Sequence, residues 1–477
     1  MDDLVAGVDV ATAEVRVTCA DGHGRVRASG RAALSPPSRP RPGWSEQDAG
    51  RWWPAVTTAL RQATTALGPA RSGVVAVAVA ATSGTVVLAD ADGRPLGPAL
   101  LYDDRRAGDA TPPAMARWAW LLASTDASAG RAGDARFAWH ASDLVVSRLI
   151  GGTPPTDWSS AHKSGYDPVA RRWPADALDA LGVPARLLPE VLPPTALAGT
   201  VCPDAAAGTG LPVGCHVRLG MTDGCAAQVA AGADRPGRFV SVVGTTLVLK
   251  GATEARIDDP TGAVYNHRHP GGWWLPGGAS NTGGAALAAG FDGADLADLD
   301  ARAAAHGPAS CVTYPLTGRG ERFPFVAPDA TGFWLGEPAG DDERYRATLE
   351  GVAFVERLGY DHLAGLGAAP DPPLASAGGG TRSRVWTAIR ASVLARELVV
   401  PASPDTAFGA CVLAAAGTVH PDLAAAADAM VTIVASVQPV DDQVERLDEG
   451  YQRLVGALQE RGWLGDATPA PRRAGPS

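Results

Sequence analysis

Two stretches in different halves of the chain repeat one local pattern: an apolar strand, a turn of small polar residues and a returning strand. The first runs over Leu4–Cys19, with its turn at Ala11–Glu14, and the second runs over Phe239–Lys250, with its turn at Gly244–Thr246. Short alternating segments on either side of such a turn predict a β-hairpin. Two halves that each open on this hairpin predict a duplicated fold with two lobes.

The length of the chain also favours two lobes. Its 477 residues are too many for a single core, and a hydrophobic content of 46% is typical of a globular protein. Segment 231–237, which ends in Arg-Pro-Gly, is the clearest boundary signal. We therefore expect an N-terminal domain over 1–236, a C-terminal domain over 237–465, and a flexible tail over 466–477, where proline, alanine and arginine predominate.

Charge and cysteine usage narrow the classes of partner. A net charge of −10 argues against nucleic acid and anionic membrane as main partners. The six cysteines are scattered without a Cys-x-x-Cys pair, which argues against a zinc site or a disulfide framework and fits a reducing cytoplasm. The start of the chain shows no secretory signal, and no apolar run is long enough for a membrane span.

Asp223 stands in a turn between Gly220 and Gly224. The β-like stretch Val213–Leu219 precedes it, and a helix of small residues follows. Two interpretations are open: the aspartate is a helix cap without further function, or its carboxylate faces a cleft.

Other predicted strands also end on polar residues. Asp9 closes the first strand and can hold a hydrated cation, or it simply caps an ordinary hairpin turn. The buried strand 74–80 runs into the turn Thr82–Thr85, at a strand end where α/β proteins tend to bind ligands. A strand near 99–102 ends on Asp103–Arg106, which either holds a polyhydroxylated substrate or is a solvated loop.

Helices are expected over Ala114–Ala123, Phe137–Ile150, Ala175–Leu181 and Arg344–Leu363. Near the C-terminus a strand runs into Gly378–Gly380 before another helix, and consecutive glycines let a flat base and phosphates approach the backbone. The P-loop, the dinucleotide-binding Gly-x-Gly-x-x-Gly and the hydrolase Gly-x-Ser-x-Gly are all absent from the sequence.

Taken in chain order, these motifs resemble the FGGY carbohydrate kinases of the actin/sugar-kinase superfamily. The matching stretches lie within residues 4–430 and are Gly7-x-Asp9-x-Ala11-Thr12, Gly43–Asp48 with Trp52 and Trp53, Tyr102–Arg105, Asp223, Gly244–Thr246 and Gly378–Ser383. The resemblance implies an α/β fold of two actin-like (ribonuclease H-like) lobes. Each would be a mixed sheet flanked by helices, with nucleotide and sugar in the cleft between them.

The resemblance also implies roles for individual residues. Asp223 would be the catalytic base, and Thr82, Ser83, Gly84, Asp104 and Asp223 would bind the substrate. ATP and its phosphates would contact Asp9, Ala11, Thr12, Gly244, Thr245, Thr246, Gly379, Gly380 and Ser383, with Asp9 also helping to hold hydrated Mg²⁺. The partners expected are therefore a sugar and ATP, for a monomer or a homodimer in the cytoplasm.

Within that family, the turn Ala81–Thr85 looks more like the D-ribulose kinases than the xylulokinases, which usually carry Ser-Gly-Gln-Met-His-Gly there. The expected reaction is ATP-dependent phosphorylation of a ketopentose, D-ribulose ahead of D-xylulose, at its terminal hydroxyl. Ala11 and Ala13 depart from the glycine and hydroxyl residue usual in the first phosphate turn. They leave two alternatives open: a non-catalytic sugar- or nucleotide-binding relative, and a kinase for another polyol or sugar.

Overall fold

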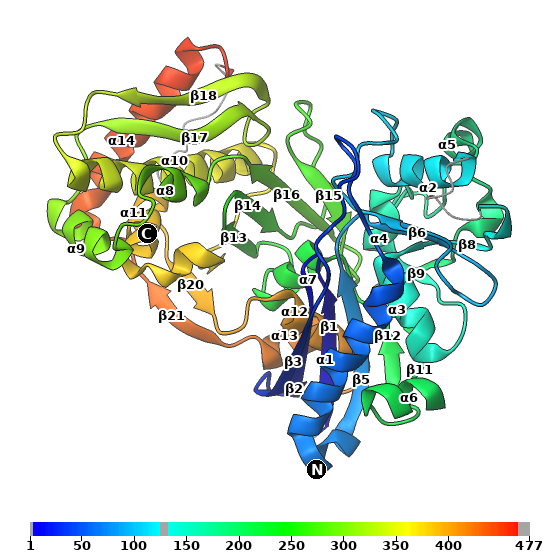
Figure 1. Cartoon of the computed structure of the whole chain (residues 1–477). Helices are drawn as coiled ribbons and strands as arrows, with labels where there is room; N and C mark the ends of the chain where they lie inside the picture. Colours follow the sequence, from blue (N-terminus) through cyan, green and yellow to red (C-terminus); the bar gives the residue numbers. More distant parts are fainter. Residues whose placement is uncertain (1–2, 125–131, 466–477) are drawn as a thin grey trace. The chain divides into compact units, whose positions relative to one another are not determined.

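The computed structural model of the chain describes residues 3–124 and 132–465 (Figure 1). Its contacts divide the chain into two compact units, one formed by Met1–Ala230 with Ser403–Thr432 and the other by Ala231–Ala402 with Ile433–Ser477. The linear domain boundary at 236/237 stays a prediction, and the contacts add that segment 403–432 packs within the N-terminal unit. The predicted tail 466–477 lies outside the described residues.

A six-stranded mixed sheet forms the centre of the first unit, in the order β11-β12-β5-β1-β2-β3. The strands are β1 (Leu4–Val10), β2 (Glu14–Asp21), β3 (Val26–Ala33), β5 (Val74–Ala81), β11 (Leu197–Thr200) and β12 (His216–Arg218). Two smaller sheets accompany it: β4 (Glu46–Gln47), β7 (Ala99–Leu100), β6 (Val86–Ala89) and β8 (Phe137–His140) in one, and β9 (Thr156–Asp157) with β10 (Val191–Leu192) in the other.

A seven-stranded mixed sheet forms the centre of the second unit, in the order β15-β16-β14-β13-β19-β20-β21. These strands are β13 (Phe239–Val243), β14 (Leu247–Gly251), β15 (Tyr265–Arg268), β16 (Trp274–Ser280), β19 (Leu374–Ala377), β20 (Leu398–Pro401) and β21 (Ile433–Val437). A separate hairpin joins β17 (Val312–Glu321) to β18 (Ala327–Leu335).

The two main sheets share one topology. In the first, β2 is antiparallel to both β3 and β1, β5 and β12 continue parallel to β1, and β11 closes antiparallel. In the second, β16, β14 and β13 are antiparallel, β19 and β20 continue parallel to β13, and β21 closes antiparallel. The duplication predicted from the two opening hairpins therefore extends through six strands of each unit.

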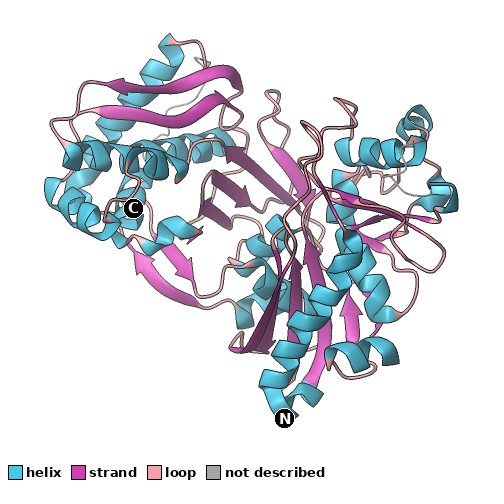
Figure 2. Ribbon diagram, viewed as in Figure 1, coloured by secondary structure: helices cyan, strands magenta, loops and turns pink. Residues whose placement is uncertain are grey.

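Helices flank both sheets (Figure 2). In the first unit they are α1 (Trp52–Leu67), α2 (Pro113–Ala123), α3 (Ala141–Ile150), α4 (Trp158–Lys163), α5 (Ala175–Leu181), α6 (Pro203–Thr209), α7 (Asp223–Ala230), α12 (Thr406–Ala415) and α13 (Leu423–Met430). In the second they are α8 (Ala285–Gly290), α9 (Leu296–His306), α10 (Asp341–Gly365), α11 (Arg384–Leu394) and α14 (Asp441–Glu460).

The predicted helix over Phe137–Ile150 is wrong in its first turn. Residues Phe137–His140 form strand β8, which pairs antiparallel with β6, and α3 begins only at Ala141. Phe137 and Trp139 point to the same side and stack, with ring centroids 4.6 Å apart. Cross-strand pairing of aromatic residues outweighs their weak helix propensity here.

Strand β1 separates two layers of helices because its side chains alternate. Leu4, Ala6, Val8 and Val10 join the same core as residues of α1. On the opposite face, Gly7 admits α12: a Cβ placed there would lie 1.9 Å from the carbonyl oxygen of Ala407. Asp9 follows Gly7 on that second face, and this placement determines the site described next.

Candidate active site

Three carboxylates of the first unit interact electrostatically at the end of β1. Asp9 is the buried penultimate residue of β1, Asp223 begins α7, and Asp405 caps α12 by accepting a hydrogen bond from the Phe408 amide (3.0 Å). The Thr406 hydroxyl also donates to the Asp223 carbonyl (3.4 Å), which joins the starts of the two helices. The negative charges of Asp223 and Asp405 both raise the pKa of Asp9.

Asp9 is paired with a cation across the hairpin. Arg16 lies directly opposite it on β2 and donates two hydrogen bonds to Oδ2, from Nε (2.9 Å) and Nη2 (2.5 Å). Burial raises the pKa of Asp9 to about 6, because loss of water outweighs the attraction of Arg16. Its other oxygen, Oδ1, is buried and has no hydrogen-bond partner among the described residues.

The turn before Asp223 is held against the end of β5. Gly220 has φ +86°, and a Cβ there would lie 2.0 Å from the Val79 carbonyl oxygen, so this position requires glycine. Thr222 then forms a parallel bridge with Ala81. Asp223 itself is the first residue of α7, whereas a capping aspartate would precede the helix.

A buried pair of side chains supports the same turn from α4. The Thr222 amide donates to Ser159 Oγ (2.9 Å), and the Ser159 hydroxyl donates to Asp157. Asp157 caps α4 by also accepting from the amides of Ser159 (2.7 Å) and Ser160 (3.1 Å). The backbone beside Asp223 is thus fixed by a chain of hydrogen bonds that begins at a helix cap.

The predicted substrate turn Thr82–Thr85 follows β5 and lies beside both β1 and Thr222. The Thr82 amide donates to the Val10 carbonyl (3.3 Å), and the hydroxyls of Thr82 and Thr85 are 2.9 Å apart. Ser83 Oγ is buried, and the described residues provide it with no hydrogen-bond partner. The bridge between Ala81 and Thr222 places the start of this turn beside the Asp223 turn, and the role of Thr82, Ser83 and Gly84 in binding substrate stays a prediction.

Asp104, also predicted to bind substrate, is enclosed by protein donors. Its carboxylate accepts from the Ser45 amide (2.6 Å) and from Arg106 Nε (2.9 and 3.0 Å), and its side chain is buried. Arg106 in turn contacts Glu46 (2.7 Å) and lies 3.8 Å above the Trp44 ring. This geometry favours a role for Asp104 in shaping the loop over a direct contact with substrate.

The turn Ala11–Glu14, predicted to bind phosphate, is braced by the motif that begins at Gly43. Gln47 Nε2 donates to the Thr12 carbonyl (3.0 Å), and Gln47 Oε1 accepts from the indole of buried Trp52 (2.9 Å). Positive φ among non-glycine residues is confined, over the described chain, to Arg171 and Ala395. Ala11 therefore adopts its place in the turn without the left-handed backbone that would favour glycine.

In the second unit, the turn Gly244–Thr246 packs on the segment that leads into α8. The amides of Gly284 and Ala285 donate to the carbonyls of Gly244 (2.8 Å) and Thr245 (3.0 Å). Thr245 is exposed. The backbone of the turn is thus held while one of its hydroxyl side chains faces outward.

The glycines after β19 reach the same strand end in the second unit. Gly378 has φ +86°, and a Cβ there would lie 2.5 Å from the Val243 carbonyl oxygen. Gly380 lies against the Val243 side chain, whereas Gly379 is exposed. Ser383 caps α11 by accepting from the Trp386 amide (2.9 Å), so its hydroxyl already has a structural role.

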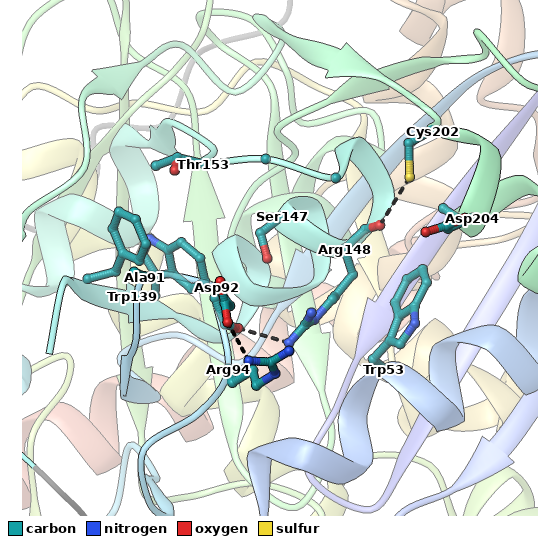
Figure 3. Close-up of a pocket in the computed structure, with 15 residues that line it drawn as sticks. Trp53, Ala91, Asp92, Arg94, Trp139, Ser147, Arg148, Thr153, Cys202 and Asp204 are labelled. Carbon is teal, nitrogen blue, oxygen red and sulfur yellow. Dashed lines mark hydrogen bonds and ion pairs between the residues drawn. The ribbon is translucent and has the colours of Figure 1, made fainter. Parts of the chain in front are cut away.

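A cavity of about 640 Å³ lies elsewhere in the first unit (Figure 3). Its lining includes Trp53, Arg94, Trp139, Arg148 and Asp204, and none of the predicted site residues. Arg94 pairs with Asp92, and Arg148 donates to the Gly93 carbonyl (3.0 Å), so the lining cations already have partners. This cavity is separate from the cluster around Asp223.

Comparison with known proteins assigns the class. Models of the FGGY family of carbohydrate kinases match residues 4–112 (N-terminal domain) and 239–418 (C-terminal domain). A xylulose kinase of Streptomyces rubiginosus is 30% identical, and the match covers 96% of each chain. The crystal structure of a xylulose kinase from Rhodospirillum rubrum aligns with a TM-score of 0.84 at 28% identity, covering 96% of this chain and 99% of the other.

The fold alone is shared more widely. A Plasmodium falciparum glycerol kinase solved with ADP aligns with a TM-score of 0.81 at 15% identity, over 96% of this chain and 98% of that one. The two α/β units and the matched domains define a carbohydrate kinase. The chain belongs to the FGGY family, which confirms the family and the fold class expected from the motifs.

Within residues 3–124 and 132–465, no helix is long and apolar enough to cross a membrane. The same residues contain no group of three or more His, Cys, Asp or Glu side chains arranged to hold a metal ion. The unbonded Oδ1 of Asp9 still fits a hydrated Mg²⁺, which keeps most of its waters and needs only one or two carboxylates.

Sequence reasoning missed three residues of this region. Arg16 faces Asp9 across the predicted hairpin, so the hairpin register alone could have identified it. Gln47 lay within a recognised motif without an assigned role. Asp405 had no local signal, because only the tertiary fold brings α12 back to the first unit.

Proposed function

We propose that the protein transfers the γ-phosphoryl group of ATP to the terminal hydroxyl of a ketopentose, D-ribulose ahead of D-xylulose. The observation that carries this proposal is the arrangement at the end of β1 and β5. There the turn Thr82–Thr85, the Asp223 turn and Asp9 are linked through Thr222–Ala81 and Thr82–Val10 contacts. Family membership supports the kinase reaction. The small hydroxyl side chains of the Thr82–Thr85 turn support a ketopentose as the substrate.

Asp223 acts as the base in this proposal. It orients the attacking hydroxyl and accepts its proton, and its backbone is fixed by Gly220, by Ser159 and by the hydroxyl of Thr406. Phosphoryl transfer depends mainly on positioning and on stabilisation of charge, so a rigid turn is what the base requires.

Phosphate binding is assigned to the two hairpin turns. Ala11 and Thr12 in the first unit, and Gly244, Thr245 and Thr246 in the second, would lie against the phosphates. The donors would be the amides and hydroxyls of the three threonines, since the amides of Ala11 and Gly244 already donate to the carbonyls of Glu14 (3.1 Å) and Thr246 (3.0 Å). Gly379, Gly380 and Ser383 are proposed to lie against the adenosine. Asp9 is proposed to help hold hydrated Mg²⁺, which would offset phosphate charge when bound, and its buried, unbonded Oδ1 supports this role.

The sugar is assigned to the Thr82–Thr85 turn. Ser83 Oγ, buried without a protein partner among the described residues, is suited to bond a sugar hydroxyl. A site that bonds a hydroxyl discriminates strongly against an analogue that lacks it. D-Ribulose and D-xylulose differ only in configuration at C3, so the expected selectivity between them is modest.

The test is kcat/KM for D-ribulose, D-xylulose, L-ribulose, glycerol and D-glucose under one Mg·ATP condition. We expect D-ribulose to give the highest value, with D-xylulose next. A preference for glycerol or glucose would refute the ketopentose assignment and leave the kinase class intact. Absence of ADP release with every sugar would instead favour the non-catalytic alternative, for which Ala11 and Ala13 are the motivating residues.

A further inference from the structure

One buried guanidinium ties the turn assigned to the sugar to the Tyr102–Arg106 loop. Arg117 lies on α2, and only 6% of the residue is exposed. Its three nitrogens each donate to a backbone carbonyl: Nη1 to Gly84 (3.0 Å), Nη2 to Tyr102 (2.6 Å) and Nε to Asp104 (3.1 Å). The acceptors belong to loops that follow β5 and β7, so one side chain sets the spacing between two segments of the chain.

The loops meet closely at this point. Gly84 has φ +80°, and a Cβ there would lie 3.8 Å from Arg117 Nη1 and 4.0 Å from the Tyr102 Cβ. Tyr102 is 56% exposed, so its ring stands at the surface above a buried contact. Burial lowers the pKa of Arg117, and the negative charges of Asp104 and Asp103 oppose that shift.

The anchor of this side chain is rigid. Met115 and Trp118, its neighbours on α2, are fully buried in a core with Val86 and Leu100. A planar guanidinium presents its donors in a fixed fork, which a lysine ammonium cannot reproduce. Removing it would leave the buried carbonyls of Gly84 and Asp104, and the half-buried carbonyl of Tyr102, without this donor, so that water must enter or the loops must move.

We propose that Arg117 is a positioning residue for sugar specificity, holding the Thr82–Thr85 turn and the Tyr102–Arg106 loop at the separation that the sugar requires. This inference rests on the proposed function, which assigns the Thr82–Thr85 turn to the sugar. Arg117 itself does not contact substrate. Its own hydrogen bonds reach neither the Ala11–Glu14 turn nor the Gly244–Thr246 turn, so we expect its main effect on the sugar.

The experiment compares wild type with Arg117→Met and Arg117→Lys in steady-state kinetics, with the sugar and Mg·ATP varied separately. We expect Arg117→Met to raise KM for the sugar at least tenfold and to leave KM for ATP within about twofold. The D-ribulose to D-xylulose ratio of kcat/KM should move towards one. Arg117→Lys should recover part of the sugar affinity, because it keeps a donor.

Arg61 provides a control at an exposed position. It also donates only to backbone carbonyls, those of Ala207 and Gly208, and it joins α1 to the end of α6, away from both loops. Arg61→Met should leave both KM values unchanged. If Arg117→Met does not fold, Arg117→Lys carries the test through the same sugar-to-ATP comparison.

The outcomes separate this inference from the proposed function. A wild-type enzyme that phosphorylates no ketopentose would overturn the proposed function. A wild-type enzyme active on ketopentoses, with Arg117 variants that change both KM values equally or neither, would overturn the role of Arg117 alone. Loss of sugar affinity in Arg61→Met to the same extent would also overturn it, because the effect would then be general to the unit.

Discussion

Substitution of Gly409 by alanine tests how tightly the position of Asp223, the proposed base, depends on helix packing. Gly409 lies on α12, and a Cβ there would be 1.9 Å from the carbonyl oxygen of Ala226 on α7. Real Cβ atoms stay beyond 3.0 Å from such an atom, so the helices must separate by about 1.1 Å (3.0 − 1.9). Asp223 begins α7, three residues before Ala226, and Asp405 caps α12, so either helix moves a carboxylate of the cluster.

A displacement of roughly 1 Å can cost about 10²-fold in rate, and overpacking a core costs about 1–3 kcal/mol. We therefore expect Gly409→Ala to fold, to lose about 1–3 kcal/mol of stability and to lower kcat about 100-fold with the best ketopentose. The assay is ADP release at saturating sugar and ATP, paired with thermal unfolding of the same sample.

The matched control is Gly456→Ala on α14, where an added Cβ would meet nothing within 4 Å. This change should leave kcat unaltered and stabilise the helix by up to about 1 kcal/mol. A folded Gly409→Ala enzyme with kcat within about threefold of wild type would refute the argument that α7 packing positions Asp223.

Three further changes test separate parts of the account. Ala11→Gly should leave kcat and KM for ATP within about threefold, because Ala11 lacks the positive φ that glycine would relieve; a tenfold tighter ATP interaction would contradict this. Ser159→Ala removes the acceptor of the Thr222 amide, so we expect kcat to fall about tenfold and stability to fall by about 1–3 kcal/mol; lost stability with unchanged kcat would make the contact purely structural. Glu343 accepts from Ala339 and Ser310, which lowers its pKa to about 2, so its stabilising effect is full above the ordinary carboxyl pKa and is lost as pH falls towards 2. Glu343→Gln should therefore lower the free energy of unfolding, measured with denaturant, by up to about 3 kcal/mol at pH 7. The difference between wild type and variant should narrow below about pH 4.5, and a difference independent of pH would contradict the role given to the Glu343 carboxylate.

Local patterns predicted the fold well where they were regular. The two opening hairpins, the strand at Val74–Ala81 and the long helix α10 all follow from periodicity that packing reinforces. Strand β8 was not predicted from local periodicity. Its four residues have the pattern of a helix start, but pairing with β6 holds them extended. Its partner lies some fifty residues earlier, and no local signal specifies that pairing.

The sequence predicted which residues lie near one another in the candidate site better than it predicted which side chains bond to each other. Asp9, the Thr82–Thr85 turn and Asp223 stand at strand ends that the topology brings to one edge of the sheet. Asp104 was expected to be open to substrate, yet Arg106 and Ser45 occupy its carboxylate. Which donor reaches a buried carboxylate depends on side-chain geometry from distant segments, and a single sequence does not encode that locally.

The most direct test of the central claim is Asp223→Asn, with turnover and sugar binding measured on the same preparation. Asparagine keeps the shape of the side chain and removes the base, so we expect D-ribulose to bind within a few-fold of wild type by calorimetry. ADP release should fall by about two orders of magnitude or more, as loss of a positioned base predicts. An Asp223→Asn enzyme that turns over like wild type would show that Asp223 only begins a helix, and the proposed mechanism would be wrong.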